Sequence, residues 1–485
     1  SNNTAVGQAA LLANTTGTQN VAVGSLAGDA MTTASYNTAV GYSALSSDTL
    51  GARNTAIGQE ALASQNFTSA TDSYNTAVGM NAGRLVTTGV QNTLIGGLAG
   101  DAITTGYYNT ALGKDALTTN TLSSLNVAIG HSALKAMSAG NAETHNVAVG
   151  SNAGLSVTTG IQNTLIGGLA GDALTDADSN VSMGYQSLSG DTLGSKSVAV
   201  GAFSLNVQNF TSATDSMNTA VGYASGGAVT TGVQNTLIGA EAGDAITTAS
   251  YNTAVGQGSL GSTTTGINNT AVGRTSLFVN TTGTQNVAIG MDALQQNSTG
   301  SQNTAVGRSA LITNTTASNN TALGYAALHA NTTGTNNTAV GANALDANIG
   351  GHDDTAVGYG VLGANTTGYS NVGVGGGASY AAAALAANTT GYGHSALGAG
   401  ALAQNTTGAL NTAVGRQAMY ANSTGSNCVA VGALALDANT TGAENTAVGN
   451  NAGTAITTGN GHVIVGMNAL KACTTGTYNT AIGRE

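Results

Sequence analysis

One 17-residue unit recurs along the chain and constrains the fold more than any other feature. Its centre is the motif Asn-Thr-Ala-Val-Gly, whose glycine stands at Gly7, Gly24, Gly41 and onward to Gly483, 28 times in 485 residues. Successive glycines are 17 residues apart, except at four longer intervals. Self-similarity at a fixed short period is typical of proteins whose units stack in a row and contact only their neighbours.

The pattern inside the unit predicts strands. We number each unit from the motif Asn (position 1), so that the motif Gly is position 5 and residues 303–319 form a typical unit. Thr or Val stands at position 2 and an aliphatic residue at position 4, and such period-two alternation indicates a strand. Seventeen residues with glycine-marked corners fit one coil of an all-β parallel β-solenoid. About 28 coils stacked at ~4.8 Å would reach roughly 130 Å.

The composition fits a single continuous repeat domain over residues 1–485 and excludes several partners. Charged residues make up 6% of the chain, the net charge is −11, and Pro and Trp are absent. Nothing resembles a basic patch, so we expect no nucleic-acid partner. No apolar run approaches ~20 residues, so we expect no membrane insertion. Cys428 and Cys473 lie more than two coils apart, too far for a disulfide.

The four longer intervals between motif glycines predict loop insertions. They place extra residues near 64–74, 135–145, 207–217 and 376–393. Such insertions are expected to leave the coil at one edge, where they can present contacts to a partner. The candidate contact residues are Phe67, Asp72, Phe210 and Asp215.

Positions 9 and 12 vary together. Eight coils carry Gly at position 9, and each of them has an aliphatic residue at position 12, as in Gly28/Met31, Gly100/Ile103 and Gly243/Ile246. Coils with Leu at position 9 usually have a polar residue at position 12, as in Leu311/Asn314. Close packing penalises both voids and overfilling. The exchange therefore predicts that the two positions share one core pocket.

Position 1 is Asn in 23 of the 28 coils. Stacked identical Asn side chains can hydrogen-bond along a solenoid and satisfy backbone groups in its turns. We therefore expect a structural ladder that begins with Asn3, Asn20, Asn37, Asn54, Asn75, Asn92, Asn109 and Asn126. The replacements in the row are Ser197, Asp354, His394, Cys428 and His462.

The repeats resemble those of known fibres. Residues 126–130 (Asn-Val-Ala-Ile-Gly) and 197–201 (Ser-Val-Ala-Val-Gly) are similar to the head repeats of YadA-like trimeric autotransporter adhesins. Asn-Thr-Thr-Gly at 331–334, followed by Asn-Thr-Ala-Val-Gly at 337–341, resembles repeats of phage tail fibres and bacterial surface fibres. The resemblance to the adhesins implies a fibre in which the chain forms trimers. The small residue at position 3, mostly Ala, fits either a contact between chains or a small solvated face.

Signs of catalysis or metal binding are weak. The six histidines are scattered, and no nucleophile has a base and an orienting group at a familiar spacing. His352-Asp353-Asp354 is the one local metal candidate, and a polar turn is the alternative. Tyrosines gather at positions 17 and 6, where they could bind sugars or neighbouring chains, or pack the corners of the coil. We expect no enzyme activity, no catalytic residue, no cofactor and no resident metal.

Three functions are compatible with these features. The first is a structural and adhesive shaft on a cell surface or virion, with itself as partner and a host-surface glycan or protein as ligand. The second is an extracellular filament whose subunits stack end to end, since motif strands stand beside both Ser1 and Glu485. The third is ice binding, because regular Thr rows on a flat solenoid face suit an ice lattice. All three predict an extracellular location.

Overall fold

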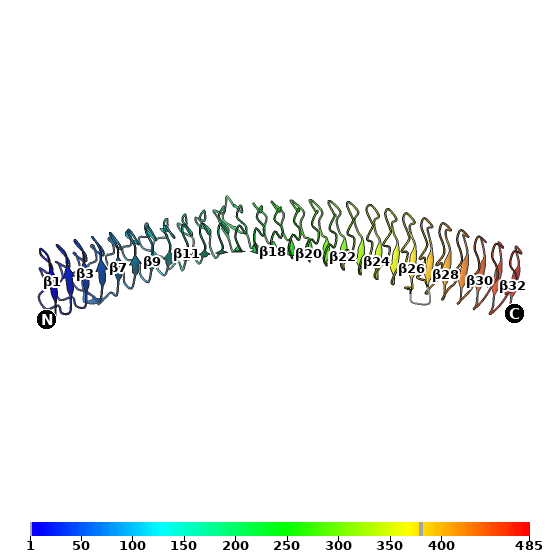
Figure 1. Ribbon diagram of the computed structural model, residues 1–485, viewed down its shortest axis with the longest axis horizontal. Helices are drawn as coiled ribbons and strands as arrows, with labels where there is room; N and C mark the ends of the chain where they lie inside the picture. Colours follow the sequence, from blue (N-terminus) through cyan, green and yellow to red (C-terminus); the bar gives the residue numbers. More distant parts are fainter. Residues whose placement is uncertain (1, 378–381) are drawn as a thin grey trace. The chain divides into compact units, whose positions relative to one another are not determined.

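The computed structural model describes residues 2–377 and 382–485. Within these residues there is no helix, and each motif forms a three-residue strand (Figure 1). Each strand pairs in parallel with the motif strand of a neighbouring coil, without a shift of register, so that Ala305 lies opposite Ala322. The 28 motif strands confirm the expected parallel β-solenoid with one coil per repeat.

The contacts divide the chain into two compact units, residues 1–248 and 249–485, where the sequence alone predicts one continuous domain. Each coil of a solenoid contacts only its neighbours, so the contacts within each half outnumber those across any one coil boundary. The motif strands of the first unit are β1 (Thr4–Val6), β2 (Val21–Val23), β3 (Thr38–Val40), β5 (Thr55–Ile57), β7 (Thr76–Val78), β8 (Thr93–Ile95), β9 (Thr110–Leu112), β10 (Val127–Ile129), β11 (Val147–Val149), β12 (Thr164–Ile166), β13 (Val181–Met183), β15 (Val198–Val200), β17 (Thr219–Val221) and β18 (Thr236–Ile238).

The second unit repeats the same arrangement. Its motif strands are β19 (Thr253–Val255), β20 (Thr270–Val272), β21 (Val287–Ile289), β22 (Thr304–Val306), β23 (Thr321–Leu323), β24 (Thr338–Val340), β25 (Thr355–Val357), β26 (Val372–Val374), β27 (Ser395–Leu397), β28 (Thr412–Val414), β29 (Val429–Val431), β30 (Thr446–Val448), β31 (Val463–Val465) and β32 (Thr480–Ile482).

Each coil turns back on itself through residues with positive φ. In the coil 303–319 these are Gly307 (φ 136°), Ser309 (57°), Leu311 (51°) and Asn319 (62°). A Cβ at Gly307 would also lie 2.4 Å from the carbonyl oxygen of Gly324 in the next coil. Only glycine satisfies both the backbone conformation and this close stacking, which explains why position 5 is always Gly.

The core of the coil is narrow and built from small residues. Positions 3 and 8 point inward, and their alanines are buried, as Ala305 and Ala310 illustrate. The buried position 3 is therefore neither a contact between chains nor a solvated face, the two alternatives left open by the sequence. Because side chains alternate along a strand, the Thr or Val at position 2 and the aliphatic residue at position 4 must point outward.

Three of the insertions enter one corner of the coil, after position 12, whereas the fourth, in the coil that begins at Asn371, enters between positions 5 and 8. Two of them add a short second strand: β6 (Thr71–Asp72) pairs with β4 (Gly51–Ala52), and β16 (Thr214–Asp215) pairs with β14 (Gly194–Ser195). The insertion near 135–145 makes one isolated bridge, from Ser124 to Glu143. The fourth, near 376–393, lies partly outside the described residues.

Candidate functional site

The Asn at position 1 links backbone groups within and between coils. The Asn303 amide Nδ2 donates to the carbonyl of Ala317, at position 15 of its own coil, at 2.8 Å. Its Oδ1 accepts from the backbone N–H of Asn320, in the next coil, at 3.0 Å. The same two bonds recur at the start of the predicted ladder, where Asn3 contacts Gly17 and the N–H of Asn20, both at 2.8 Å. The ladder thus closes each coil and joins it to the next.

Two of the replacements in this row, His394 and Cys428, keep the same two contacts by other chemistry, whereas Nε2 of His462 is buried without a hydrogen-bond partner. His394 contacts the carbonyl of Gly408 through Nε2 at 2.7 Å, and its Nδ1 accepts from the N–H of Asn411 at 3.3 Å. These contacts require a neutral ring with the proton on Nε2, and burial lowers the pKa of His394 to about 4. Cys428 donates from Sγ to the carbonyl of Gly442 at 3.4 Å.

Asp354 is the one ionisable carboxylic acid in the position 1 row. Its Oδ1 accepts from the N–H of Asn371 at 2.8 Å, and its Oδ2 accepts from Asn365 Nδ2 at 3.1 Å. Burial raises the pKa of Asp354 to about 7, against the lowering effect of its hydrogen bonds to Asn371. When protonated, Asp354 regains the donor that Asn supplies elsewhere in the row.

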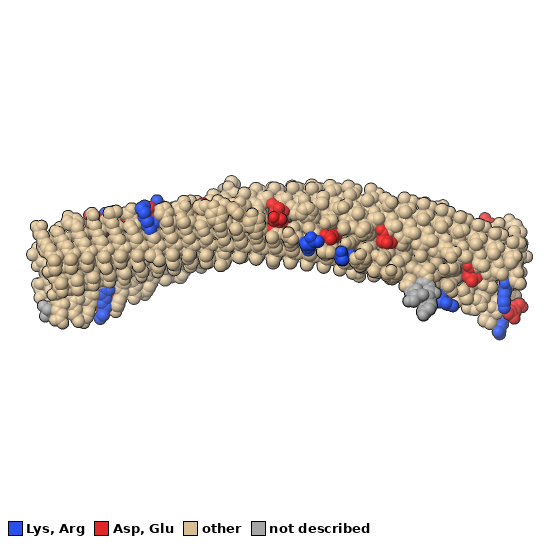
Figure 2. All heavy atoms as spheres, viewed as in Figure 1, with Lys and Arg blue, Asp and Glu red and all other residues tan. Residues whose placement is uncertain are grey.

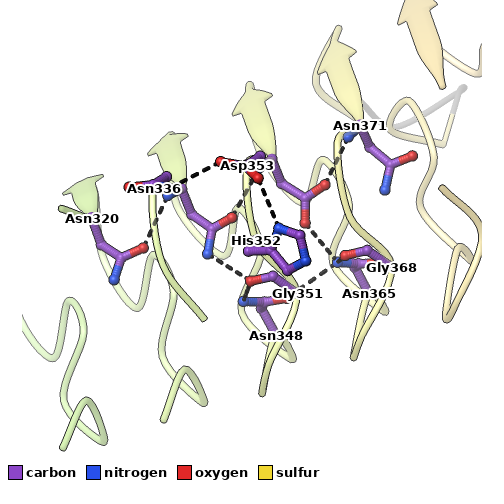
Figure 3. A network of polar contacts seen from close by, with 11 residues as sticks. Asn320, Asn336, Asn348, Gly351, His352, Asp353, Asn365, Gly368 and Asn371 are labelled. Carbon is purple, nitrogen blue, oxygen red and sulfur yellow. Dashed lines mark hydrogen bonds and ion pairs between the residues drawn. The ribbon is translucent and has the colours of Figure 1, made fainter. Parts of the chain in front are cut away.

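The neighbouring His352 and Asp353 form a separate surface pair. His352 Nδ1 lies 2.8 Å from Asp353 Oδ2, and Asn336 donates to Asp353 Oδ1 at 3.1 Å (Figure 3). The His352 ring stacks on Tyr369, with centroids 5.1 Å apart. Asp354, by contrast, is buried in the row. Among the described residues, no three His, Cys, Asp or Glu side chains converge as a metal site would require.

A second Asn ladder runs through the core of residues 249–485, at position 12. Asn314 Nδ2 donates to Asn297 Oδ1 at 2.7 Å and also to the carbonyl of Ala317 at 3.0 Å. The exchange between positions 9 and 12 predicts that position 12 points inward, but it does not predict this second ladder. Its signal is the run of Asn at position 12 in successive coils: Asn280, Asn297, Asn314, Asn331, Asn348, Asn365, Asn388, Asn405, Asn422 and Asn439. All of these side chains are buried, which leaves no room for an N-linked glycan.

Positions 9 and 12 fill the same pocket. A Cβ added at Gly100 would lie 2.8 Å from the Cδ1 atom of Ile103, and one at Gly28 would lie 2.4 Å from the Cε atom of Met31. Gly243 and Ile246 stand in the same relation, at 2.8 Å. In coils with Leu at position 9 and a polar residue at position 12, both side chains are buried, as Leu311 and Asn314 illustrate.

The pocket has a third contributor that the sequence comparison missed. A Cβ at Gly83 or Gly100 would meet the Cδ atoms of Leu94, at 2.6 and 2.8 Å. Leu94 stands at position 3, where most coils have Ala, and it belongs to the second of two successive coils that have Gly at position 9. Leu165 and Leu237 occupy the same place in similar pairs of coils.

The candidate contact loops differ from expectation in two residues. Phe67 and Phe210 are only 5% and 6% exposed, so they do not present contacts to a partner. The Phe210 N–H bonds to the buried carboxylate of Asp191, and its ring packs against Gly194. Because Gly194 has no side chain, the Phe210 ring can pack directly over the backbone at this corner of the coil.

The two acidic residues of the loops remain at the surface. Asp72 pairs with Arg53 at 3.0 Å, and Asp215 pairs with Lys196. The Arg53 guanidinium also lies 4.7 Å from the ring centroid of Tyr36. These ion pairs tie each insertion to the coil before it.

The outward side of the motif strands forms a regular surface, which we call the outward sheet face and define as positions 2 and 4. Position 4 is Val, Ile, Leu or Met in all 28 coils, and position 2 is Thr, Val or Ser. Aliphatic side chains at position 4 are partly open to solvent: Val306 and Val340 are half-buried, and Leu397 is 50% exposed. The face carries no charge, and Figure 2 shows that charged side chains are sparse over the view it presents.

The tyrosines at positions 17 and 6 are also partly exposed. Tyr108 and Tyr325 are 52% and 55% exposed. Some of the rings pack against other rings edge to face, as Tyr185 and Phe203 do at 5.6 Å. These rings therefore pack at the corners of the coil and also leave part of their surface open to solvent.

Comparison of this chain with protein-family models and with curated proteins finds no match. Within the part of the chain that the structure describes, no helix is long and apolar enough to cross a membrane.

Proposed function

We propose that this chain is a non-enzymatic structural and adhesive shaft of an extracellular fibre, on a cell surface or a virion, in which copies associate side by side through the outward sheet face. The observation that supports this most is the uninterrupted row of aliphatic residues at position 4. Extended apolar surface of this kind typically marks an interaction site. A second copy has the same spacing between coils, so its position 4 side chains can match those of the first copy coil by coil.

The available area is sufficient for a stable contact. A three-residue strand spans about 10 Å, and neighbouring strands lie about 4.8 Å apart, so each coil offers roughly 50 Å² of outward sheet face. A standard interface needs about 800 Å² on each partner. The 14 motif strands of each compact unit would offer roughly 700 Å², close to this standard area.

The mechanism of such a shaft is mechanical. Backbone hydrogen bonds join each coil to the next at several points, for example Thr304 N–H to the Asn320 carbonyl at 2.8 Å and Leu311 N–H to the Ala327 carbonyl at 3.0 Å. The two Asn ladders add side-chain bonds along the same direction. Stretching or bending the stack would break many of these bonds together.

Negative-stain electron microscopy of the purified chain tests this proposal. Discrete rods, each containing two or more chains side by side, are expected. Single-chain particles would contradict it. Fibres of indefinite length with the width of one chain would instead favour end-to-end stacking, the alternative filament function.

Ice binding is a second candidate, favoured by one observation. Thr occupies position 2 in 18 of the 28 coils, on the outward sheet face. Where successive coils both carry Thr at position 2, their hydroxyl groups are spaced about 4.8 Å apart. A thermal hysteresis assay on the purified chain checks this function, and freezing behaviour equal to that of a control protein would remove it.

A further inference from the structure

An unusual cavity lies beside position 10 of the coil that begins at Asn218. Position 10 carries an acidic residue in six coils: Asp29, Asp101, Asp172, Asp244, Asp346 and Asp437. Each acid stacks on position 10 of the preceding coil, and in the same order these residues are Leu12, Arg84, Leu155, Gly227, His329 and Tyr420. Asp244 is thus the one acid in this set that follows a residue without a side chain.

An internal repeat shows which residue fills this place in the matching coil. The eight residues 66–73 are identical to residues 209–216, which places Gly227 in register with Arg84 and Asp244 in register with Asp101. We call the place of Arg84 and Asp101 the first site and the place of Gly227 and Asp244 the second site. At the first site, burial raises the pKa of Asp101, and the positive charge of the nearby Arg84 opposes that effect. At the second site, burial and the neighbouring Glu241 both raise the pKa of Asp244, with no cation to oppose them.

The missing side chain leaves an open cavity of about 570 Å³. Its walls include Phe203, Val207 and Tyr223, and Asp244 lines it beside Gly227. The Phe203 and Tyr223 rings pack edge to face, with centroids 6.0 Å apart. At the first site the corresponding residues are Glu60, Ser64 and Met80. The second site therefore combines an uncompensated carboxylate with aromatic walls that the first site lacks.

We propose that this cavity, which we call the Gly227 cavity, binds an alkylguanidinium or alkylammonium group in the place that Arg84 takes at the first site. The carboxylate of Asp244 would accept charge-assisted hydrogen bonds from the cation. The rings of Phe203 and Tyr223 would add cation–π attraction and apolar contact for the alkyl stem. This inference does not depend on the proposed shaft function. The cation can come from an Arg or Lys side chain of a partner protein or from a free small amine.

Calorimetric titration of the full chain with N-acetyl-arginine amide tests the proposal, with N-acetyl-citrulline amide as the uncharged control ligand. We expect binding of the arginine compound and at least tenfold weaker binding of the citrulline compound. Asp244→Asn and Gly227→Arg should each weaken arginine binding at least tenfold, since the first removes the carboxylate and the second fills the cavity. Asp172→Asn, at an equivalent acid covered by Leu155, should leave binding unchanged.

Equal binding of both ligands, or arginine binding that neither Asp244→Asn nor Gly227→Arg reduces, would overturn the proposal. Circular dichroism of each variant establishes that it is folded, and Gly227→Arg introduces the residue that the chain itself carries at Arg84. A titration with agmatine separates the two sources of the cation. Agmatine binding equal to that of an arginine-containing peptide favours a free amine, and much tighter peptide binding favours a protein side chain.

Discussion

The Oδ1 atom of Asn303 accepts a 3.0 Å hydrogen bond from the backbone N–H of Asn320, one coil further along the chain. The same side chain closes its own coil through the carbonyl of Ala317. One residue per coil therefore satisfies two buried backbone groups. This relationship explains both the frequency of Asn at position 1 and the kinds of residue that replace it.

Asn303→Ala should destabilise the solenoid by about 1 to 3 kcal/mol. It leaves the buried N–H of Asn320 without its acceptor, which costs about 1 to 3 kcal/mol, whereas the carbonyl of Ala317 keeps its hydrogen bond from Asn314 Nδ2. Chemical denaturation followed by circular dichroism measures the effect. Gln302→Ala, a change at the exposed neighbour, should cost less than 1 kcal/mol, and equal losses for the two variants would contradict the role of the ladder.

Asn303→His should retain most of the stability lost in Asn303→Ala. His394 makes both ladder contacts with its two ring nitrogens, so the row accepts a neutral imidazole. The same denaturation experiment compares the two variants at pH 8, where the buried ring is neutral. A histidine variant no more stable than the alanine variant would show that the ring does not replace the amide at this coil.

Gly100→Ala should destabilise the chain by about 2 to 4 kcal/mol. The new methyl group would lie 2.8 Å from both Ile103 Cδ1 and Leu94 Cδ2, at a residue with φ of 56°. Overpacking costs about 1 to 3 kcal/mol, and the left-handed conformation adds about 1 kcal/mol for a non-glycine residue. Thermal unfolding of this variant and of Gly97→Ala provides the comparison, because a Cβ at Gly97 meets no atom within 4 Å.

Asp354 should make stability depend on pH. The pKa of Asp354 is raised by burial from 3.8 to about 7, so the folded chain binds a proton that the unfolded chain releases near pH 4. The stabilisation is complete below about pH 4 and is lost as the pH rises through about 7. By linkage its magnitude is about 4 kcal/mol.

Asp354→Asn should remove this dependence and raise the melting temperature at pH 8. Asp353→Asn is the matched control, because His352 holds the pKa of Asp353 below its usual value and this group does not titrate between pH 5 and 8. Melting temperatures measured across that range compare the three chains. If the melting temperature of Asp354→Asn varies with pH as strongly as that of the wild-type chain, Asp354 is not the group responsible for the pH dependence.

The sequence was enough to predict the coil, because both the 17-residue step and the exchange between positions 9 and 12 report packing directly. Gly100 and Ile103 share one pocket of fixed volume, so a small residue at one position is matched by a large residue at the other. This exchange of residue size is visible in the sequence. The orientation of position 3 could not be read in this way, because Ala fits a core, an interface or a solvated surface equally well. Leu94 was the informative exception, since a large residue there requires room inside.

Other features depend on contacts that have no sequence period. Phe67 lies in an insertion, and an insertion gives no register from which to infer whether a ring points inward or outward. The Gly227 cavity depends on a missing side chain beside Asp244, and its sequence signal is visible only after the coils are aligned at position 10. The Asn row at position 12 was visible, but its hydrogen bonds depend on how closely the coils stack.

The mass of the chain in solution, measured by light scattering during gel filtration, tests most directly whether the outward sheet face joins copies of this chain. We expect the wild-type chain to elute at a multiple of 46.9 kDa. Val306→Lys with Val340→Lys, which places charge on the outward sheet face, should reduce the mass towards that of one chain, whereas Gln302→Lys with Asn319→Lys, at exposed corners, should not. A wild-type mass of one chain, or an assembly that the outward lysines leave intact, would contradict the account.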